Sequence, residues 1–258
     1  MAKILSLMHK KGGAGKSTVA KLMASAFLFK DAKVLLIDMD ENGDYLGWWQ
    51  RAVENGLSSD KLSARFAEDS KALFEIINNN EDDFDIIIVD TKGEAIGYAD
   101  DLAGASDALI MPCMNSKADR ERAAETLKWH DDLRARASDP SDIPPIFVVM
   151  TRVAAPLFTH IEGTPKPAKI ASREFERHYE IINQFDPLKT MIPENPRYRE
   201  MDEQGTLGAI IQKLRNSDNP SDRMSLVHWE TAMAHSINLI NNIYSGERLR
   251  AKKGERAT

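Results

Sequence analysis

The segment Lys11-Gly12-Gly13-Ala14-Gly15-Lys16-Ser17-Thr18 combines closely spaced glycines with lysine and hydroxyl side chains. Glycines let a backbone curl so that successive N–H groups point at an anion, and a helix that follows adds its dipole. Lys16 would then reach phosphate oxygens and the Ser17 hydroxyl would ligate Mg²⁺. The alternative is a glycine-rich turn with an incidental lysine. The pattern favours a loop, Gly12 to Thr18, that holds the phosphates of ATP and its Mg²⁺.

Carboxylates follow two apolar segments farther along the chain. Asp38 and Asp40 come after Val34–Ile37, and Asp90 comes after Ile86–Val89. A carboxylate at the carboxyl end of a parallel strand faces a phosphate site at the same edge of the sheet. An aspartate after one apolar strand is weak evidence, because many such residues only cap the next turn. Together with the glycine-rich segment, these carboxylates predict that the strand ends meet at one phosphate site, with Ser17 and Asp90 at its magnesium ion.

Short apolar segments alternate with segments of helix length, and this order predicts a doubly wound, mostly parallel α/β sheet flanked by helices. Ile86–Val89 is apolar on both faces, as a central parallel strand must be. The predicted strands are Ile4–Met8, Val34–Ile37, Leu62–Phe66, Ile86–Val89, Ala108–Met111, Ile146–Met150 and a short one near Met191-Ile192. The predicted helices are Lys16–Phe29, Asp44–Asn55, Ser70–Ile77, Ala118–Ala137, Ile170–Phe185 and about Met224–Tyr244, with a helix-and-turn region before Arg215.

The remaining segments predict one domain with a short extension. Residues 154–169 contain several prolines and a glycine, which indicates an irregular loop. We expect a single domain over residues 1–245 and a polar basic tail over residues 246–258. The tail carries basic residues but only one large apolar side chain, Leu249, so we expect no insertion into a membrane.

Composition excludes several classes of protein. The 258 residues have a formal net charge of −6, and 42% of them are apolar, which suits one folded core rather than a disordered chain. The apolar runs are far shorter than the ~18 residues that span a bilayer. A lone cysteine, Cys113, cannot form an internal disulfide and favours a reducing compartment, so we expect a cytoplasmic protein.

The glycine-rich segment resembles the deviant Walker A box of the ParA/MinD ATPases, which are P-loop NTPases. An ordinary P-loop has glycine where this chain has Lys10, and Lys11 precedes the double glycine instead. The resemblance implies an ATP-dependent homodimer in which Lys11 reaches the partner's ATP. It also implies that Asp40 orients the attacking water, that Asp38 helps to hold the magnesium shell and the loop, and that hydrolysis is slow until a partner stimulates it. A solvated surface lysine is the alternative for Lys11.

The resemblance extends to residues near the carboxyl ends of later strands. Relatives place base-contacting residues after the sixth and seventh strands, which implies an adenine pocket at Thr151, Arg152 and Pro193. Here Glu41-Asn42 replaces the Pro-Gln that follows Asp40 in many relatives. Asp38 to Asn42 with Trp48 downstream resembles the VirC-type members, accessory ATPases that recruit DNA-processing complexes to conjugation-like secretion machinery.

Among the family's branches, the chain is most similar to the short ParA type, since only ten residues precede Lys11 and no cysteine set can hold a metal cluster. The resemblance implies non-specific DNA binding in the ATP-bound dimer, association with the nucleoid, and a ParB-like or other adaptor. The candidate DNA-contacting residues are Arg120, Arg122, Lys128, Arg134, Arg136, Arg197, Arg199, Lys213, Arg215 and the basic tail. A metabolic synthetase or kinase and a regulatory module without turnover remain alternatives.

Overall fold

A computed structural model of the protein describes residues 1–9, 13–40, 44–91, 98–160 and 162–249. Its centre is a six-stranded sheet in the order β3-β2-β4-β1-β5-β6, and every pairing is parallel. The strands are β1 (Lys3–Leu7), β2 (Val34–Asp38), β3 (Leu62–Phe66), β4 (Ile86–Asp90), β5 (Ala108–Cys113) and β6 (Ile146–Met150). The expected α/β fold with a parallel sheet is confirmed.

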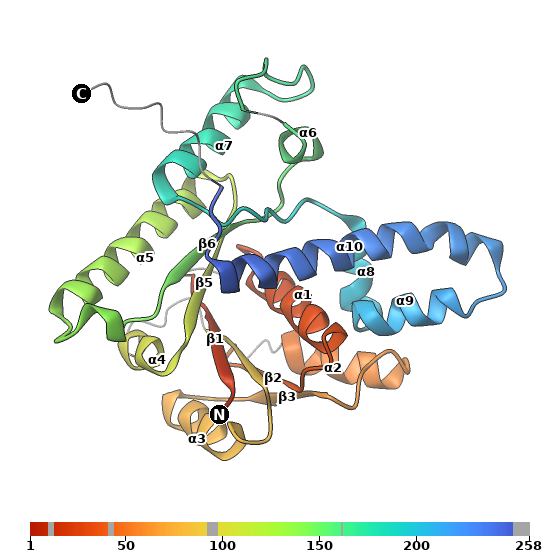
Figure 1. Ribbon diagram of the computed structural model, residues 1–258, viewed down its shortest axis with the longest axis horizontal. Coiled ribbons are helices and arrows are strands. Elements are labelled where there is room, and N and C mark those ends of the chain that lie inside the picture. The colour runs from red at the N-terminus through yellow and green to blue at the C-terminus, as the bar shows by residue number, and fades with distance from the viewer. Residues whose placement is uncertain (10–12, 41–43, 92–97, 161, 250–258) are drawn as a thin grey trace.

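Helices cover both faces of the sheet, as Figure 1 shows. On one face α1, α2, α8, α9 and α10 share a continuous apolar core with the sheet, and α3, α4, α5 and α7 pack on the other face. The helices are α1 (Lys16–Phe29), α2 (Asp44–Glu54), α3 (Ser70–Asn80), α4 (Ala99–Ala105), α5 (Lys117–Arg136), α6 (Ala155–Phe158), α7 (Ser172–Phe185), α8 (Pro196–Gln204), α9 (Leu207–Arg215) and α10 (Pro220–Ser245).

The central strand β4 explains why its sequence is apolar without alternation. Ile86 and Ile88 face the core that contains α1, while Ile87 and Val89 face the core that contains α3. Successive side chains of a strand point to opposite faces, so a strand covered on both sides must be apolar at every position. Side-chain caps fix where several helices begin: Asp69 accepts from the N–H of Ala72, and Ser116 accepts from that of Asp119.

The prediction of a seventh strand near Met191-Ile192 is wrong. In its place the described chain has an isolated parallel bridge between Val153 and Pro193. Leu188 and Ile192 donate backbone hydrogen bonds to the carbonyls of Val148 and Met150, at 2.8 Å each, so this segment still lies beside β6. Val153 donates to the Ile192 carbonyl at 3.1 Å and accepts from the Glu194 N–H at 3.0 Å, so the contact is one bridge on either side of Pro193 rather than a ladder.

Two helices were missed in the sequence. Helix α4 contains small residues and two adjacent aspartates, which give little helical periodicity, and α6 is a single turn within the expected loop 154–169. Residues 246–249, which we had assigned to the tail, contact the domain. The N–H of Leu249 donates to the carbonyl of Pro187 at 2.7 Å, and the Arg248 guanidinium lies 4.7 Å from the centre of the Phe147 ring.

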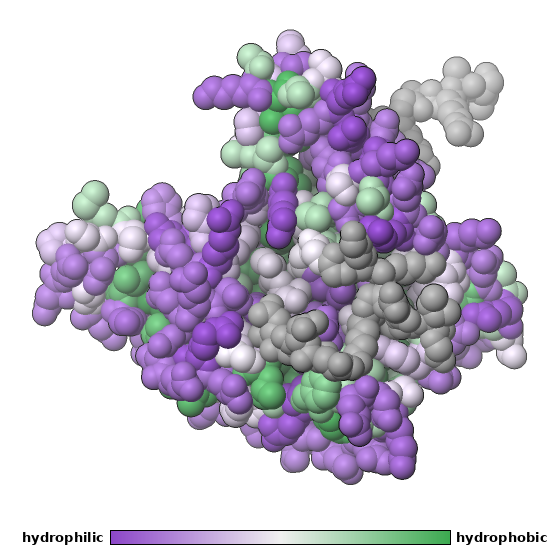
Figure 2. Space-filling view, turned by 180° about the vertical axis from the view of Figure 1, so that it is seen from behind, coloured by the Kyte–Doolittle hydropathy of each residue, from purple (hydrophilic) through white to green (hydrophobic). Residues whose placement is uncertain are grey.

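In the described part of the chain, we find no helix that combines the length and the apolar character needed to cross a bilayer. Figure 2 shows a face on which hydrophilic residues predominate and hydrophobic residues appear as small scattered patches. Such scattered patches are normal on folded proteins.

The junction between α8 and α9 generates a prediction about stability. Gly205 has φ +147°, and a Cβ there would lie 2.4 Å from the Leu57 carbonyl oxygen. Gly205→Ala should therefore lower the free energy of unfolding by about 2 kcal/mol or more, measured by urea denaturation. Gly104→Ala in α4 is the matched control, because no described atom lies within 4 Å of its Cβ position, and it should stabilise by about 0.5–1 kcal/mol. Equal effects of the two substitutions would contradict the prediction.

Candidate nucleotide-binding site

The glycine-rich segment lies between β1 and α1, as the sequence predicted. Gly13 and Gly15 have φ values of +97° and +92°, which only glycine adopts without strain. Gly15 is the N-cap of α1, so the free N–H groups of the first helical turn face the loop. The Ala14 carbonyl accepts a hydrogen bond of 2.9 Å from the Thr151 hydroxyl, which ties the loop to the end of β6. The described half of the loop is thus shaped for an anion.

The two predicted metal carboxylates are brought together by strand register. Asp38 pairs with Asp90 across β2 and β4, and Leu7 of β1 pairs with Asp90 on the other side. The chain enters the glycine-rich segment shortly after Leu7. Because parallel strands place their carboxyl ends at one edge, the loop and both carboxylates share a single site.

Asp90 is buried beside the first turn of α1. The Ser17 hydroxyl donates to Asp90 Oδ2 at 3.3 Å, and Lys16 Nζ lies 4.0 Å from Asp90 Oδ1. The pKa of Asp90 is raised to about 7: burial raises it most, the Lys16 charge and the hydrogen bond from Tyr45 lower it, Asp38 raises it and the bond from Ser17 lowers it. Within the described residues, Asp90 Oδ1 has no hydrogen-bond partner. A buried carboxylate oxygen in this state is suited to a cation or to its bound water.

Asp38 organises the loop that follows β2. Its Oδ1 accepts the backbone N–H of Asp40 at 2.9 Å, and its Oδ2 accepts the backbone N–H of Tyr45 at 3.0 Å. The Tyr45 bond links this carboxylate to the first turn of α2, where a negative charge also suits the helix dipole. Asp40, in contrast, is exposed and borders the phosphate site. The structure therefore separates a buried, fixed carboxylate from an exposed one that can meet solvent.

The residues at this edge fit a magnesium ion that is shared with a nucleotide. In the part of the chain that is described, no group of three or more His, Cys, Asp or Glu side chains is arranged to hold a metal. Mg²⁺ bound to a nucleotide usually takes one or two protein oxygens and draws its other ligands from phosphates and water. Ser17, Asp38 and Asp90 supply that kind of partial oxygen set.

Two adjoining cavities make up the site. A cavity of about 270 Å³ is lined by Gly13, Gly15, Lys16, Ser17, Thr18, Asp38, Asp40, Asp90, Thr91 and Arg152. A second of about 490 Å³ is lined by Gly15, Thr18, Lys21, Thr151, Arg152, Ile192, Pro193, Glu194, Asn195, Tyr198, Arg199, Met201, Asp202 and Glu203. The cavities share Gly15, Thr18 and Arg152, so a ligand with its phosphates in the first can extend into the second.

The predicted base-contacting residues Thr151, Arg152 and Pro193 all line the larger cavity. Arg152 has φ +52°, a left-handed conformation that is uncommon for a non-glycine residue and often found at functional sites. Two predicted residues, Lys11 and Gly12, lie outside the described residues. The sequence analysis missed Thr91, whose hydroxyl donates to the Leu7 carbonyl at 2.8 Å, and the whole contribution of α8.

The family model for the VirC1 protein matches residues 2–246. A curated relative, the protein VirC1 of Rhizobium radiobacter, is 26% identical over 127 residues, which cover 49% of this chain and 55% of that protein. The chain thus matches only about half the length of this curated relative.

Solved structures share the fold at low identity. One is a candidate plasmid partition protein of Borrelia burgdorferi B31, bound to AMPPNP, with a TM-score of 0.60 at 17% identity. The matched region covers 95% of this chain and 100% of that structure's chain. Another is cobyrinic acid a,c-diamide synthase of Mycobacterium smegmatis, with ADP and magnesium, with a TM-score of 0.57 at 16% identity. The matched region covers 98% of this chain and 100% of that structure's chain. These likenesses show the fold alone, because a biosynthetic enzyme and a partition protein share it.

Asp90 generates a prediction about pH. Its pKa is higher in the folded protein than in the unfolded chain, so the folded protein holds the Asp90 proton more tightly. The stabilisation from Asp90 is therefore fully present below the unfolded pKa and is lost as pH rises toward about 7. Between pH 5 and pH 7, the nucleotide-free protein should lose of order 2 kcal/mol of unfolding free energy relative to Asp90→Asn. Urea denaturation of both proteins across this range measures the difference.

The comparison with Asp90→Asn is needed because another buried group titrates in the opposite sense. Burial, and the charge of nearby His160, lower the pKa of His178 to about 4. The unfolded chain therefore binds a proton at His178 more readily than the folded protein does, and the unfolding free energy falls as pH drops below the unfolded pKa. That slope is common to both proteins and cancels in the difference. If the unfolding free energies of the wild type and Asp90→Asn differ by the same amount at every pH from 5 to 7, the raised pKa of Asp90 is contradicted.

Proposed function

The chain belongs to the VirC1 protein family, and we propose that it is an ATPase of the ParA type that acts as a nucleotide-dependent switch. The observation that carries the proposal is the convergence of the glycine-rich loop, Asp38 and Asp90 at one edge of the sheet. A phosphate cavity beside a larger cavity is the arrangement that a nucleoside triphosphate requires.

Each described side chain then has a role set by its position. Lys16 and the first turn of α1 bind the phosphates, and Ser17, Asp38 and Asp90 hold the magnesium ion, which neutralises charge on the phosphates when it is bound. Asp40 borders the same cavity from an exposed position, and its N–H is fixed by Asp38. It is the carboxylate placed to orient a water molecule next to the terminal phosphate.

The larger cavity receives the nucleoside part of ATP. Pro193 and the aliphatic part of Arg152 offer surface to an adenine ring, and Thr151 anchors this wall to the phosphate loop through its bond to Ala14. Adenine contacts at Thr151, Arg152 and Pro193 are thus part of the proposal, supported by their common position on one cavity.

The switch consists of an ATP-dependent homodimer. Lys11, which is outside the described residues, would lend its ammonium group to the nucleotide of the partner subunit, as in the ParA/MinD family. A cation supplied across an interface in this way stabilises charge on the transferring phosphoryl group. Hydrolysis, slow alone and faster with an adaptor protein, would return the protein to its monomeric form.

The ATP-bound dimer would bind DNA without sequence preference, in the cytoplasm at the nucleoid. Many of the candidate cations are engaged in ion pairs, including Arg136 with Asp100 at 2.6 Å and Arg215 with Glu230 at 2.7 Å. Arg120, Arg197 and Arg199 are also paired with glutamates. Apart from the basic tail, the remaining candidates lie on α5 and α9, which stand on opposite sides of the molecule in Figure 1. A continuous basic surface would therefore need two protomers, a physical reason for DNA binding to depend on dimerisation.

The cargo is the finer part of the proposal. Membership of the VirC1 family favours an accessory role in which the ATPase recruits a DNA-transfer complex to a secretion or conjugation machine. A plasmid partition role with a ParB-like adaptor would use the same switch. A metabolic synthetase or kinase would need a second substrate beside the terminal phosphate, and its assembly state would not depend on the nucleotide.

Sizing the protein by light scattering with ATP, with ADP and without nucleotide tests the switch. The wild type should be dimeric only with ATP and Mg²⁺, and Asp40→Ala should remain dimeric because it cannot complete hydrolysis. Lys11→Ala should stay monomeric, with ATP turnover lowered by roughly 10³-fold or more if its ammonium acts as an arginine finger does.

Lys10→Ala is the matched control, since it removes the neighbouring lysine. It should dimerise and turn over ATP like the wild type. A wild type that remains monomeric with ATP, or equal losses from Lys10→Ala and Lys11→Ala, would count against the proposed dimer.

DNA binding gives a separate prediction. Fluorescence anisotropy with a random-sequence duplex should show tight binding for Asp40→Ala with ATP and weak binding for the same variant with ADP. If the dimer makes ~6 phosphate contacts, log K should fall against log salt with a slope near about −5. Affinity that is the same with both nucleotides, or insensitive to salt, would refute DNA binding by the ATP-bound dimer.

A further inference from the structure

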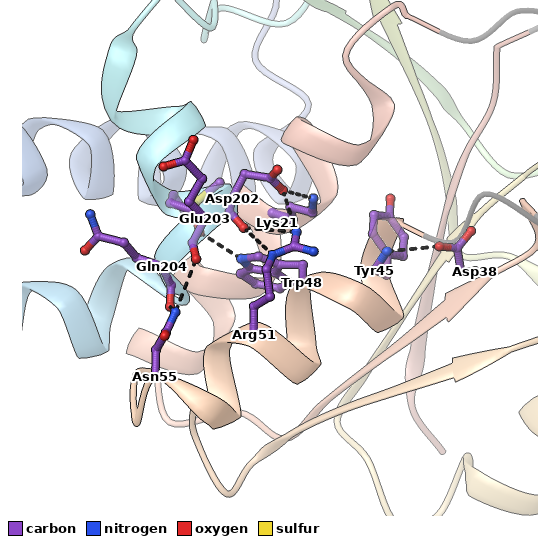
Figure 3. Close-up of polar contacts among 10 residues, drawn as sticks. Lys21, Asp38, Tyr45, Trp48, Arg51, Asn55, Asp202, Glu203 and Gln204 are labelled. Carbon is purple, nitrogen blue, oxygen red and sulfur yellow. Dashed lines mark hydrogen bonds and ion pairs between the residues drawn. The ribbon is translucent and has the colours of Figure 1, made fainter.

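Side chains of α1 and α2 converge on the C-terminal end of α8, as Figure 3 shows. Trp48 and Arg51 of α2 and Asn55, the residue that directly follows the helix, lie three and four positions apart, so they project from the same side of α2 and its C-terminal turn. We call these three residues the α8 clamp. They belong to no part of the phosphate site described above.

The α8 clamp binds the main-chain oxygens of the last helical turn, of which, among the described residues, only the Met201 carbonyl also accepts a main-chain hydrogen bond, from the Gly205 N–H at 2.9 Å. Trp48 Nε1 donates to the Met201 carbonyl at 3.0 Å, and it does so from a fully buried side chain. Arg51 donates twice to the Asp202 carbonyl, from Nε at 3.2 Å and from Nη2 at 3.1 Å. The C-terminal turn of α8 is therefore fixed by α2 rather than by solvent.

The third residue of the clamp completes the set. Asn55 Nδ2 donates to the carbonyls of Glu203 and Gln204, at 3.2 and 3.0 Å. Just beyond, the Leu57 carbonyl accepts the Thr206 N–H at 2.9 Å. All four terminal carbonyls of α8 thus accept hydrogen bonds from side chains of α2 or of Asn55, the residue after it.

Asp202 adds a charged bond from α1. Its carboxylate pairs with the ammonium of Lys21, a lysine that is only 2% exposed, and lies 3.7 Å from Arg51 Nη2. The Lys21 ammonium also lies 5.8 Å from the centre of the Trp48 ring. A buried ammonium has lost its water, so removal of the Asp202 charge leaves Lys21 with an uncompensated cost of burial even though the intact pair need not add net stability.

The wall that Asp202 fixes belongs to the larger cavity. Tyr198, Met201 and Asp202 of α8 line that cavity, while Gly15 and Thr18 line it from the side of the phosphate loop. Lys21 lies on α1 three residues, or slightly less than one turn, beyond Thr18. The Lys21–Asp202 pair therefore sets the separation between the two walls of the cavity.

The other end of α2 contacts the phosphate site. Tyr45 donates its N–H to Asp38, and Figure 3 shows this bond at the opposite end of α2 from Asn55. Helix α2 thus joins the phosphate site, through Asp38, to the wall of the nucleoside cavity, through the α8 clamp.

We propose that Asp202 is a positioning residue for the nucleoside part of the bound nucleotide: its carboxylate joins α1, α2 and α8, and this junction holds the α8 wall at the distance from the phosphate loop that the nucleoside needs. The inference rests on the proposed function, because it takes the larger cavity as the nucleoside site. Phosphate binding itself requires no contribution from Asp202.

The test compares a ligand that has a nucleoside with one that has only phosphates. Asp202→Asn keeps the size of the side chain but removes the charge that pairs with Lys21. Its affinity for ATP with Mg²⁺ should fall about tenfold or more, as expected for a lost charged contact. Its affinity for inorganic tripolyphosphate with Mg²⁺, measured by competition, should change by less than about twofold. Asp202→Glu should recover part of the ATP affinity.

Asp218→Asn, at the exposed turn between α9 and α10, is the matched control and should leave both affinities unchanged. Arg51→Ala covers the case in which Asp202→Asn fails to fold, since the Arg51 side chain is 42% exposed and its loss should show the same selective effect on ATP. Lys21→Met combined with Asp202→Asn should be less harmful than the sum of the single changes, because both act through one pair.

If Asp202→Asn loses as much affinity for tripolyphosphate as for ATP, the proposal is overturned and Asp202 is merely structural. An unchanged affinity of Asp202→Asn for ATP would also overturn it. Failure of the proposed function looks different. In that case the wild type itself would bind neither ligand, whereas failure of this inference leaves a wild type that binds ATP.

Discussion

The structure depends on placing a buried carboxylate next to a lysine at the edge of a parallel sheet. Asp90 is brought there by β4, and Lys16 by the helix that follows β1. Burial opposes the charge on Asp90, and Lys16 and Ser17 only partly compensate for it. A site that holds such a carboxylate without a full set of partners is prepared for a cation, which explains why the loop, the helix and the strand ends all face one cavity.

Helix α2 extends this organisation beyond the phosphates. It begins at the hydrogen bond between Tyr45 and Asp38 and ends against α8, whose terminal carbonyls it caps with Trp48, Arg51 and Asn55. The two cavities of the site therefore share a rigid element in addition to the residues that line both. In a protein that switches with its nucleotide, such an element is a physical route by which the phosphate end and the nucleoside end are kept in register.

The fold alone does not decide the function, because a partition protein and a biosynthetic synthase share it at similar TM-scores. The family match says more about this chain than the fold does, because the VirC1 family model matches residues 2–246. This agrees with the resemblance seen at Lys11, at Asp38 to Asn42 and at Trp48. The proposals on dimerisation, DNA and cargo are built on that family and on the geometry of the site.

The sequence by itself determined the parallel α/β fold, the position of the phosphate loop and the approach of Asp38 and Asp90 to that loop. These follow from local signals: apolar runs such as Ile86–Val89, and glycines that only a curled loop requires. Only the tertiary structure decided the register that pairs Asp38 with Asp90 and the residues that line the larger cavity. Lys21 and Asp202 lie 181 positions apart, and neither residue type nor periodicity predicts a pair at that separation. For the same reason the prediction of a seventh strand was wrong: how the segment around Ile192 meets β6 and Val153 depends on long-range contacts that a local pattern does not contain.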